Sequence, residues 1–217
     1  MKFTCVIGTY NPNPSWLDRA VNSAMGLFDE IVIVDDGSTN DCVPVAWIST
    51  NVAQQIKKIK HDTNKGFYEA KNTAIRNSTG DIIASLDDDD YFNAAGVVEL
   101  KEFIEEHDSD VWHFILRQFN ESTDLYGQGA NPEGLYSHSA IPSQSWFKRS
   151  MWEELGGYTY PLAEDWDFWL RAYKRGKRFT YFPRIVYNYN RRSDSLSAQW
   201  TGQKFDKIYR EVMERNK

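Results

Sequence analysis

The fold is decided by residues 80–92, GDIIASLDDDDYF. Residues 82–86 form a continuous apolar run, which predicts a buried strand, and four aspartates, Asp87 to Asp90, begin where that strand should end. Two carboxylates about 4 Å apart repel by roughly 4 kcal/mol at an effective dielectric constant near 20. Such a cluster must be solvated, partly protonated or held by a cation, and oxygen ligands suit Mg²⁺ or Mn²⁺. A solvated acidic turn is the alternative for this segment taken alone.

Apolar runs alternate with helical patterns on both sides of this stretch. Strands are predicted at residues 3–7, 31–34, 56–59, 81–86 and 111–116, with helices between them at residues 17–25, 43–55, 69–77 and 97–104. Strands that alternate with helices predict βαβ units around a mostly parallel sheet.

The second half of the chain has a different pattern. Residues 120–140 are rich in Gly, Ser, Asn and Pro and predict a long loop. Short helices are expected at residues 152–155 and 167–173, and an amphipathic helix at residues 205–212. Residues 178–182 and 185–189 resemble two strands that Pro183 separates.

Composition predicts a single globular domain. The chain has 217 residues, of which 41% are hydrophobic and 15% aromatic. The net charge of −6 disfavours nucleic acid as a partner and gives no general attraction to anionic lipid. With no membrane span and no secretory signal in the sequence, we expect a cytoplasmic location, which leaves peripheral membrane association open.

Polar groups follow three of the predicted strands. Gly8, Thr9 and Tyr10 come after the first strand, Asp35 and Asp36 after the second, and the aspartate run after the fourth. In open α/β sheets, ligands bind in the crevice beyond the carboxyl ends of the strands, so these groups should converge on one pocket. A simple turn is the alternative for residues 35–38, since Asp and Gly are common turn residues.

A third signal lies at residues 163–169, AEDWDFW. Glu164 and Asp165 would lie at a helix N-terminus, where the helix dipole favours carboxylates. Trp166 and Trp169 would suit the apolar face of a sugar, which predicts a general base beside an aromatic platform. The alternative is an ordinary helix start with aromatic core residues.

Phosphate-binding loops are missing from the sequence. It contains neither G-x-x-x-x-G-K-[ST] nor G-x-G-x-x-G. The acids are therefore not part of a P-loop ATPase or a dinucleotide site, and they also lack the Gly and terminal Glu of a calcium loop.

Five segments in order resemble an inverting glycosyltransferase of family 2, which has the GT-A fold. They are VIGTYN at 6–11, VIVDDGSTND at 32–41, NKGFYEAKNTAI at 64–75, GDIIASLDDDDYF at 80–92 and ELGGYTYPLAEDWDFWLRAYKRG at 154–176. The resemblance implies one GT-A domain, a Rossmann-like α/β/α sandwich with a smaller antiparallel part in the C-terminal half. Residues 1–118 would bind the nucleotide sugar, and residues 119–217 would bind the acceptor and carry the base and a C-terminal helix.

The resemblance also implies roles for single residues. Tyr10 and Asp36 would hold the nucleotide base, beside Gly8 and Thr9 in the same crevice. Asp165 would be the catalytic base, and its neighbour Glu164 would shape the acceptor site.

The aspartate run would hold the metal and the donor diphosphate. Asp87 and Asp89 match the family's D-x-D motif, with Asp89 as the first metal ligand and Asp87 or Asp90 in support. Asp88 falls on the variable position of that motif.

Two positions depart from the family pattern. Lys71 stands where an arginine is common, and it can pair with phosphate as a point charge. Arg192 stands near the place of a common histidine, and Arg191 and Arg192 would neutralise the diphosphate, unless they form a solvated basic turn.

The function implied is metal-dependent sugar transfer with inversion. The donor would be a nucleoside-diphosphate sugar, with UDP as the first choice, the cofactor Mn²⁺ or Mg²⁺, and the acceptor a hydroxyl of a glycan or lipid-linked glycan. The rival hypotheses are a sugar-nucleotide pyrophosphorylase and a catalytically silent carbohydrate-binding module.

Overall fold

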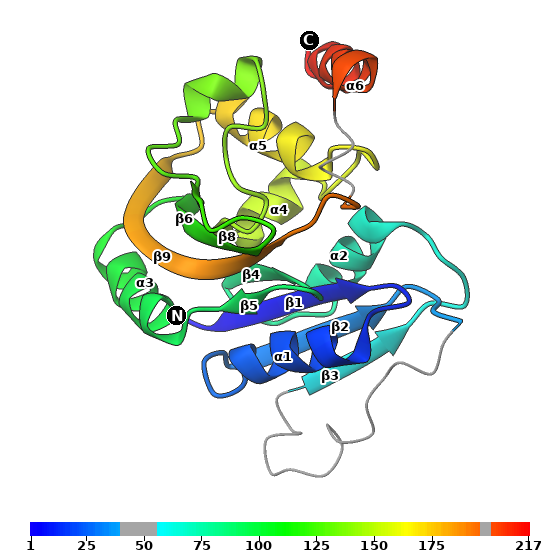
Figure 1. Cartoon of the computed structure of the whole chain (residues 1–217). Coiled ribbons are helices and arrows are strands. Elements are labelled where there is room, and N and C mark those ends of the chain that lie inside the picture. The colour runs from blue at the N-terminus through cyan, green and yellow to red at the C-terminus, as the bar shows by residue number, and fades with distance from the viewer. Residues whose placement is uncertain (40–55, 196–200) are drawn as a thin grey trace.

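A single curled sheet runs through the computed structural model, which describes residues 1–39, 56–195 and 201–217 (Figure 1). The strand order is β3-β2-β1-β4-β8-β6-β9-β5, with β7 paired to β6. The strands are β1 (Phe3–Thr9), β2 (Glu30–Asp35), β3 (Ile56–Lys60), β4 (Ile82–Asp87), β5 (Tyr91–Phe92), β6 (Val111–Asn120), β7 (Leu125–Tyr126), β8 (Trp146–Lys148) and β9 (Phe179–Arg191). The helices are α1 (Pro14–Ala24), α2 (Phe67–Arg76), α3 (Ala94–Glu106), α4 (Arg149–Leu155), α5 (Glu164–Lys174) and α6 (Gly202–Arg215), with a 3₁₀ turn, η3 (Pro132–Tyr136).

The first part of the sheet is parallel, as the sequence predicts. Strands β3, β2, β1 and β4 lie side by side in one direction. Side chains alternate between the two faces of a strand. Phe3, Cys5 and Ile7 therefore join the core beneath α1, whereas Val6 joins the core beneath α2. The two faces are thus covered by different helices, and the sandwich has three layers (Figure 1).

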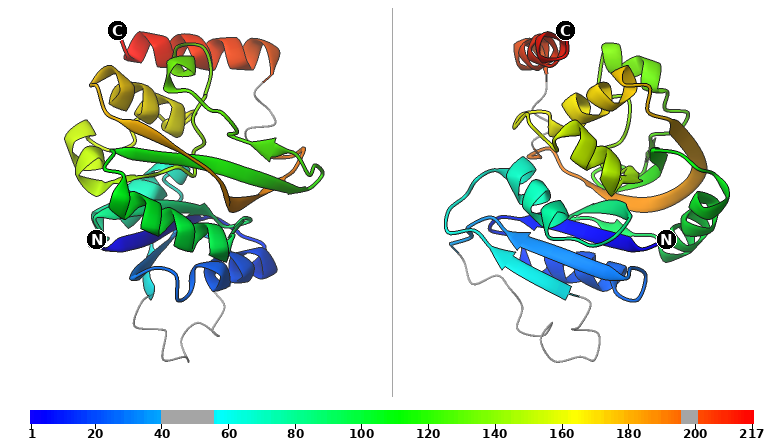
Figure 2. Two further views of the ribbon diagram at one scale, coloured as in Figure 1. Left: turned by 90° about the vertical axis from the view of Figure 1, so that its left-hand side faces the viewer. Right: turned by 180° about the vertical axis from the view of Figure 1, so that it is seen from behind.

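The second part of the sheet combines parallel and antiparallel pairs. Strands β6 and β9 run parallel and form the strongly curved wall seen in Figure 2. Strand β8 joins this wall to the parallel part, because it pairs antiparallel with both β4 and β6. The short strands β5 and β7 pair antiparallel with β9 and β6. The predicted mixed α/β architecture is confirmed.

One expectation about β9 is wrong. Pro183 does not separate two strands, since β9 continues through it from Phe179 to Arg191. Phe114 pairs with Phe182, but Ile115 pairs with Ile185, so Pro183 and its neighbour fall in a register shift. A proline that cannot donate to the ladder is tolerated at such an irregularity. The expected helix at residues 43–55 lies outside the described residues.

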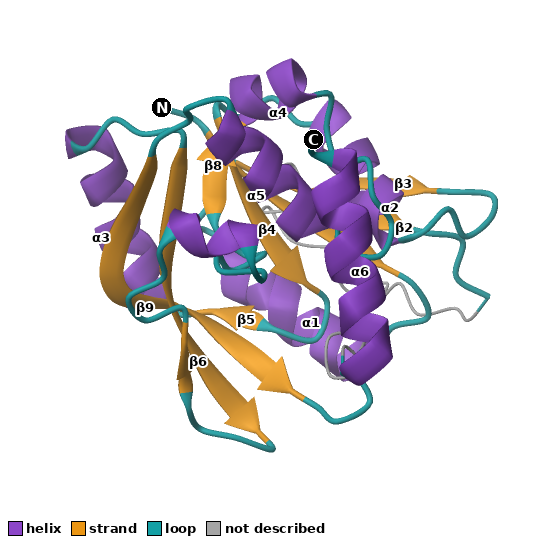
Figure 3. Ribbon diagram, turned by 90° about the horizontal axis from the view of Figure 1, so that it is seen from above, coloured by secondary structure: helices purple, strands orange, loops and turns teal. Residues whose placement is uncertain are grey.

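Helices α4, α5 and α6 pack on one face of the curved wall, where α6 crosses above α5 (Figure 3). Asp167 of α5 is buried and holds this corner together. Its carboxylate accepts hydrogen bonds from Thr159, Arg171 and Asn216 at 3.1, 2.9 and 3.0 Å. The described part of the chain contains no helix long and apolar enough to span a bilayer.

Candidate functional site

The carboxyl ends of β1, β2 and β4 meet at one edge of the sheet. Thr9 pairs with Asp35 on one side of β1, and Gly8 pairs with Asp87 on the other. A cavity of about 650 Å³ opens at this edge, within the size range of small-molecule sites. Its lining includes Gly8, Thr9, Tyr10, Asp36, Lys71, Asp87, Asp88, Asp89, Tyr126, Leu162, Glu164, Asp165 and Arg192. The three predicted acidic signals therefore share one cavity.

The end of β1 needs a small residue. A Cβ on Gly8 would lie 3.2 Å from the Ala70 Cβ and 3.4 Å from the Phe67 ring. Glycine therefore lets α2 approach the strand and carry Lys71 toward the cavity. Next to it, the Thr9 hydroxyl donates a hydrogen bond to the Asp88 carboxylate, and Tyr10 is 47% exposed.

Asp36 is buried beneath the loop that leads into α2. The Lys65 and Gly66 backbone N–H groups donate to its carboxylate at 2.9 and 2.8 Å, and His61 Nδ1 lies 2.7 Å from Oδ1. The other ring nitrogen of His61 lies 3.0 Å from the Thr73 hydroxyl. Among the described residues, Oδ2 accepts one hydrogen bond, from the Gly66 N–H, which leaves a further acceptor lone pair on this oxygen. The carboxylate is thus held rigidly at the cavity wall.

Asp87, Asp88 and Asp89 all line the cavity. Gln144 donates to Asp87 Oδ2 at 3.1 Å, whereas Oδ1 is buried without a hydrogen-bond partner. Arg192 Nη2 lies 3.1 Å from Asp89 Oδ2. Burial and the neighbouring carboxylates raise the pKa of Asp88 and of Asp89 to about 6. The cluster is short of positive charge.

Asp90 does not belong to this ligand set. It has no exposed surface and does not line the cavity, and its Oδ1 accepts a hydrogen bond of 2.6 Å from the Asn190 backbone N–H. Burial, followed by repulsion from Asp87 and Asp89, raises the pKa of Asp90 well above the usual range of a carboxyl group. The expectation that Asp90 faces the metal and the donor is wrong, because the side chain turns inward to link β4 with β9.

The remaining acids fit a divalent cation by their chemistry. Asp87 Oδ1 is buried and accepts no hydrogen bond from the described residues, although the Lys71 ammonium lies 3.8 Å away, and Asp89 lines the same cavity. Mg²⁺ and Mn²⁺ take such oxygen ligands and are commonly completed by water and substrate phosphates. Among residues 1–39, 56–195 and 201–217, no three metal-binding side chains form a ready cluster. The protein would supply Asp87 and Asp89 and leave the other positions open.

Lys71 joins the aspartate run to α5. Its ammonium is buried, 3.8 Å from Asp87 Oδ1, 3.4 Å from Glu164 Oε1 and 4.2 Å from the centre of the Phe67 ring. Burial alone would lower the pKa of Lys71, but the carboxylates of Asp87, Glu164 and Asp165 outweigh it and raise that pKa. Lys71 is therefore a permanent cation between the two acidic groups.

Glu164 and Asp165 occupy the first turn of α5, which has no side-chain cap. Burial raises the pKa of Glu164 to about 7, even though Lys71 acts in the opposite direction. Burial also raises the pKa of Asp165, against Lys71 and a hydrogen bond of 3.3 Å from the Ser139 hydroxyl. A carboxylate with a raised pKa binds a proton more readily, as a general base requires.

The two tryptophans of this segment are not at the cavity. Trp166 and Trp169 are both 0% exposed. Trp166 stacks on Phe205 of α6 and donates to the Leu135 carbonyl, and Trp169 packs against the Phe147 ring. The predicted acceptor platform is wrong at these positions, because both side chains lie on the core face of α5.

Some cavity residues are given no role by the sequence analysis. Asp88 is a lining residue although it falls on the variable position of the motif, and it is bound through Thr9. The 120–140 loop and its continuation bring in Tyr126, Ser139 and Gln144, which lie far from the strand ends in sequence. Polar residues in a Gly- and Ser-rich stretch look alike until the loop is folded.

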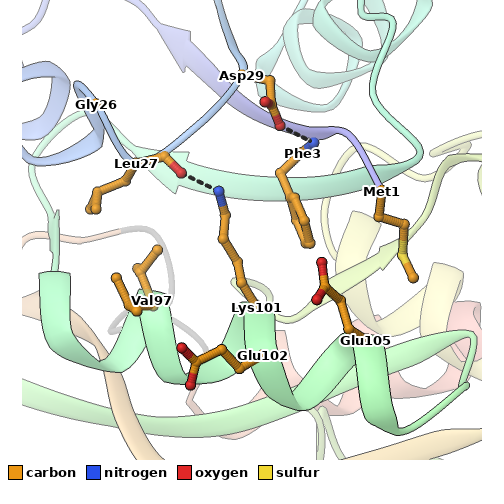
Figure 4. A pocket seen from close by; sticks show the side chains of 10 residues that line it. Met1, Phe3, Gly26, Leu27, Asp29, Val97, Lys101, Glu102 and Glu105 are labelled. Atoms are coloured by element: carbon orange, nitrogen blue, oxygen red, sulfur yellow. Dashed lines mark hydrogen bonds between the residues drawn. The ribbon is translucent and has the colours of Figure 1, made fainter.

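A second, smaller hollow of about 350 Å³ lies at the opposite end of β1, next to α3 (Figure 4). Its central cation, Lys101, donates to the Leu27 carbonyl and lies 4.5 Å from the centre of the Phe3 ring. Asp29 accepts a hydrogen bond of 2.8 Å from the Phe3 N–H. The polar groups of this hollow therefore form contacts within the protein that stabilise the fold.

Comparison with known proteins identifies the family to which this chain is similar. Residues 4–161 match the model of the family described as "Glycosyl transferase family 2". An uncharacterized glycosyltransferase of Bacillus subtilis, YwdF, is 28% identical over 91% of this chain and 78% of its own length. A PGL/p-HBAD biosynthesis glycosyltransferase of Mycobacterium bovis is 30% identical over 87% of this chain and 76% of its own length.

A solved structure shares the fold. Staphylococcus aureus TarS, residues 1–349 in complex with UDP-GlcNAc, has a TM-score of 0.80 and 22% identity over the whole chain. The chain spans 65% of that TarS structure. At this identity the likeness shows the fold, which is the predicted GT-A fold. With the family model matching most of its length, the chain belongs to glycosyl transferase family 2 and is a transferase enzyme.

Proposed function

We propose that the protein transfers a sugar from a UDP-sugar to a hydroxyl group of a glycan or glycoconjugate, with inversion at the anomeric carbon and with a divalent metal. One observation carries this proposal. The aspartates at the end of β4 and the Glu164–Asp165 pair of α5 line one cavity, and Lys71 contacts both groups. The groups that we assign to donor binding and the group that we assign as the catalytic base are therefore present in the same cavity.

The choice of UDP is supported by the structural likeness to TarS, which was solved with UDP-GlcNAc and with UDP. Tyr10 and the rigidly held Asp36 are the groups we assign to the nucleotide base. On this assignment residues 1–118 bind the donor, while the acceptor is bound mainly by residues 119–217. Family membership favours this activity over the pyrophosphorylase and the silent binding module.

Asp87 and Asp89 would hold Mn²⁺ or Mg²⁺ together with the donor diphosphate. The cation, when bound, neutralises the charge that builds up on the leaving diphosphate. Arg192, which lies at Asp89, and Lys71, which lies at Asp87, add positive charge on the protein side.

Asp165 then takes the proton of the acceptor hydroxyl. The hydroxyl oxygen forms a bond with the anomeric carbon from the face opposite the diphosphate, and the bond from that carbon to the diphosphate oxygen breaks. Because a single displacement exchanges the two faces, the configuration inverts. Holding both reactants in one cavity supplies the proximity that this step needs.

Replacing the base tests the assignment. Asp165→Asn keeps the shape of the side chain but removes its basicity, so we expect transfer to fall by about 10²-fold or more. The Kd for UDP, measured by calorimetry with Mn²⁺, should stay near the wild-type value. Transfer at more than a tenth of the wild-type rate would show that another group takes the proton.

A further inference from the structure

Acceptor recognition needs a new assignment because the two tryptophans of α5 are buried. The cavity still has apolar surface near the proposed catalytic base, Asp165. Tyr126 and Leu162 both line it, and they are 42% and 46% exposed. Leu162 precedes Asp165 by three positions, while Tyr126 comes from the distant β7.

We propose that Tyr126 is the platform on which a pyranose ring of the acceptor stacks, and that Ser139 fixes this platform relative to the base. This inference rests on the proposed function. It assigns the aromatic contact with the acceptor to a residue outside all five family-like segments.

Ser139 connects the platform with the base through two hydrogen bonds. The Tyr126 hydroxyl donates to the Ser139 backbone carbonyl at 3.4 Å, and the Ser139 hydroxyl donates to Asp165 Oδ2 at 3.3 Å. Burial of its hydroxyl, with the nearby Asp165 and Tyr189, raises the pKa of Tyr126 to about 12. The phenol is therefore neutral and tied at one end, while part of its ring surface remains open to a ligand.

The backbone around Tyr126 also holds the ring in place. Tyr126 pairs with Leu116 of β6, which lines the same cavity. Gly127 follows with φ of 79°, and a Cβ there would lie 2.7 Å from the Phe114 carbonyl oxygen. Only glycine permits this close turn directly after Tyr126.

The surroundings of Tyr126 suit a sugar. A pyranose has an apolar C–H face and a rim of hydroxyl groups. The tyrosine ring matches the face, and a rigid aromatic ring binds at little cost in conformational entropy. Gln118 and Ser143 line the same cavity and supply amide and hydroxyl groups for the rim.

The test uses UDP-sugars with Mn²⁺ and a panel of methyl pyranosides as acceptors. For the best wild-type pair, we expect Tyr126→Ala to raise the acceptor KM about tenfold, which corresponds to about 1.4 kcal/mol, with a smaller change in kcat. Tyr126→Phe keeps the ring and should keep the acceptor KM within about threefold of wild type. Because it removes the hydrogen bond to Ser139 that fixes the ring relative to Asp165, we expect its kcat to fall, and an unchanged kcat would overturn the role of Ser139. The Kd for UDP should not change in either variant.

Two further variants keep the result interpretable. Tyr126→Leu preserves apolar packing on Leu116 and removes only the flat ring, so it replaces the alanine variant if that one does not fold. Tyr136→Ala is the matched control, because Tyr136 is exposed on η3 and is not among the cavity-lining residues.

An unchanged acceptor KM in Tyr126→Ala and Tyr126→Leu would overturn the platform and leave the proposed function standing. A wild-type enzyme that hydrolyses a UDP-sugar but transfers to none of the pyranosides would overturn the acceptor class. A wild-type enzyme that binds no UDP-sugar would instead overturn the proposed function itself.

Discussion

Lys71 is the residue on which the electrostatics of the cavity depend. Its ammonium is shared between Asp87 and Glu164, and it favours the charged forms of both Glu164 and Asp165. An arginine in its place would present a planar fork, whereas the compact ammonium acts as a point charge over the Phe67 ring. A single cation thus connects the donor side of the cavity to the base.

The pH dependence of transfer follows from this arrangement. The pKa of Glu164 is raised to about 7, so Glu164 gains a proton as the pH falls through neutrality. The pKa of Asp165 is also raised by burial, so Asp165 gains a proton at a higher pH than an ordinary aspartate does. We expect kcat to fall as the pH drops, with an acid limb above the ordinary range of a carboxyl group, because Asp165 must lose its proton to act as the base and its neighbour Glu164 is protonated below about pH 7.

Lys71→Met should move this acid limb to higher pH, because the cation that lowers both pKa values is gone. Lys71→Arg keeps the charge and serves as the control. The measurement is a kcat–pH profile of all three proteins, and an acid limb that stays in place in Lys71→Met would contradict the role of Lys71.

Sequence reasoning located the acids of the site but not their partners. Asp87 and Asp89 could be found because a run of acids directly after an apolar strand is unusual, and Glu164 and Asp165 because they stand in a segment that resembles the family. Asp90 could not be separated from its neighbours, since its inward turn depends on the Asn190 backbone a hundred residues away. Separation in sequence also hides Gln144, which lies 57 positions from its partner Asp87, and Tyr126, which comes from a loop with no periodic pattern.

Helix α5 shows how one element serves both the core and the cavity. Its first turn presents Glu164 and Asp165 to the cavity, while Trp166, Phe168 and Trp169 fill the space beneath α6 and β8. Aromatic burial on one face fixes the helix axis and hence the position of the carboxylates. The aromatic residues therefore contribute to activity through stability and not through contact with sugar.

Removing one of these side chains should cost stability before anything else. Trp169→Ala leaves a large cavity in the core, and we expect it to lower the free energy of unfolding by about 3–5 kcal/mol. Val98→Ala is the control, since Val98 is exposed on α3 and should change stability by less than about 0.5 kcal/mol. Urea unfolding measures both, and wild-type stability in Trp169→Ala would contradict its placement in the core.

Long periodic elements could be predicted from the sequence, and short ones could not. The helices α1, α2 and α3 and the parallel strands follow clear apolar spacing. The two- and three-residue strands β5, β7 and β8 are too short to show a period, and they exist because long-range neighbours offer them hydrogen bonds. Tertiary pairing also carries β9 through Pro183.

At the scale of the whole molecule, the cavity connects distant parts of the chain. Its lining comes from the ends of β1, β2 and β4, from α2, from the loop after β6 and from the start of α5. A donor that binds there contacts several of these elements at once, so binding should stabilise the whole fold.

A UDP-sugar with Mn²⁺ at 100 times its Kd should stabilise the protein by about 2.7 kcal/mol. For a chain of this size, that corresponds to a rise in Tm of about 5–10 °C in a thermal-shift experiment. Asp87→Asn should lose the part of the shift that depends on Mn²⁺ and keep the part due to the nucleotide. An equal shift in EDTA and in Mn²⁺ for the wild type would argue against the metal.

The pairing of β9 sets the order in which the protein can be completed. Strand β9 pairs along ten positions with β6 and also recruits β5, whose partner residues lie about a hundred positions away. During synthesis, the parallel strands β1 to β4 can assemble early, but the curved wall must wait until residue 191 has left the ribosome. Pairings of such separation form slowly. The nascent chain therefore exposes the unpaired edge of β6 from the completion of β6 at Asn120 until Arg191 has emerged, and we expect yield in cells to depend on chaperones that protect that edge.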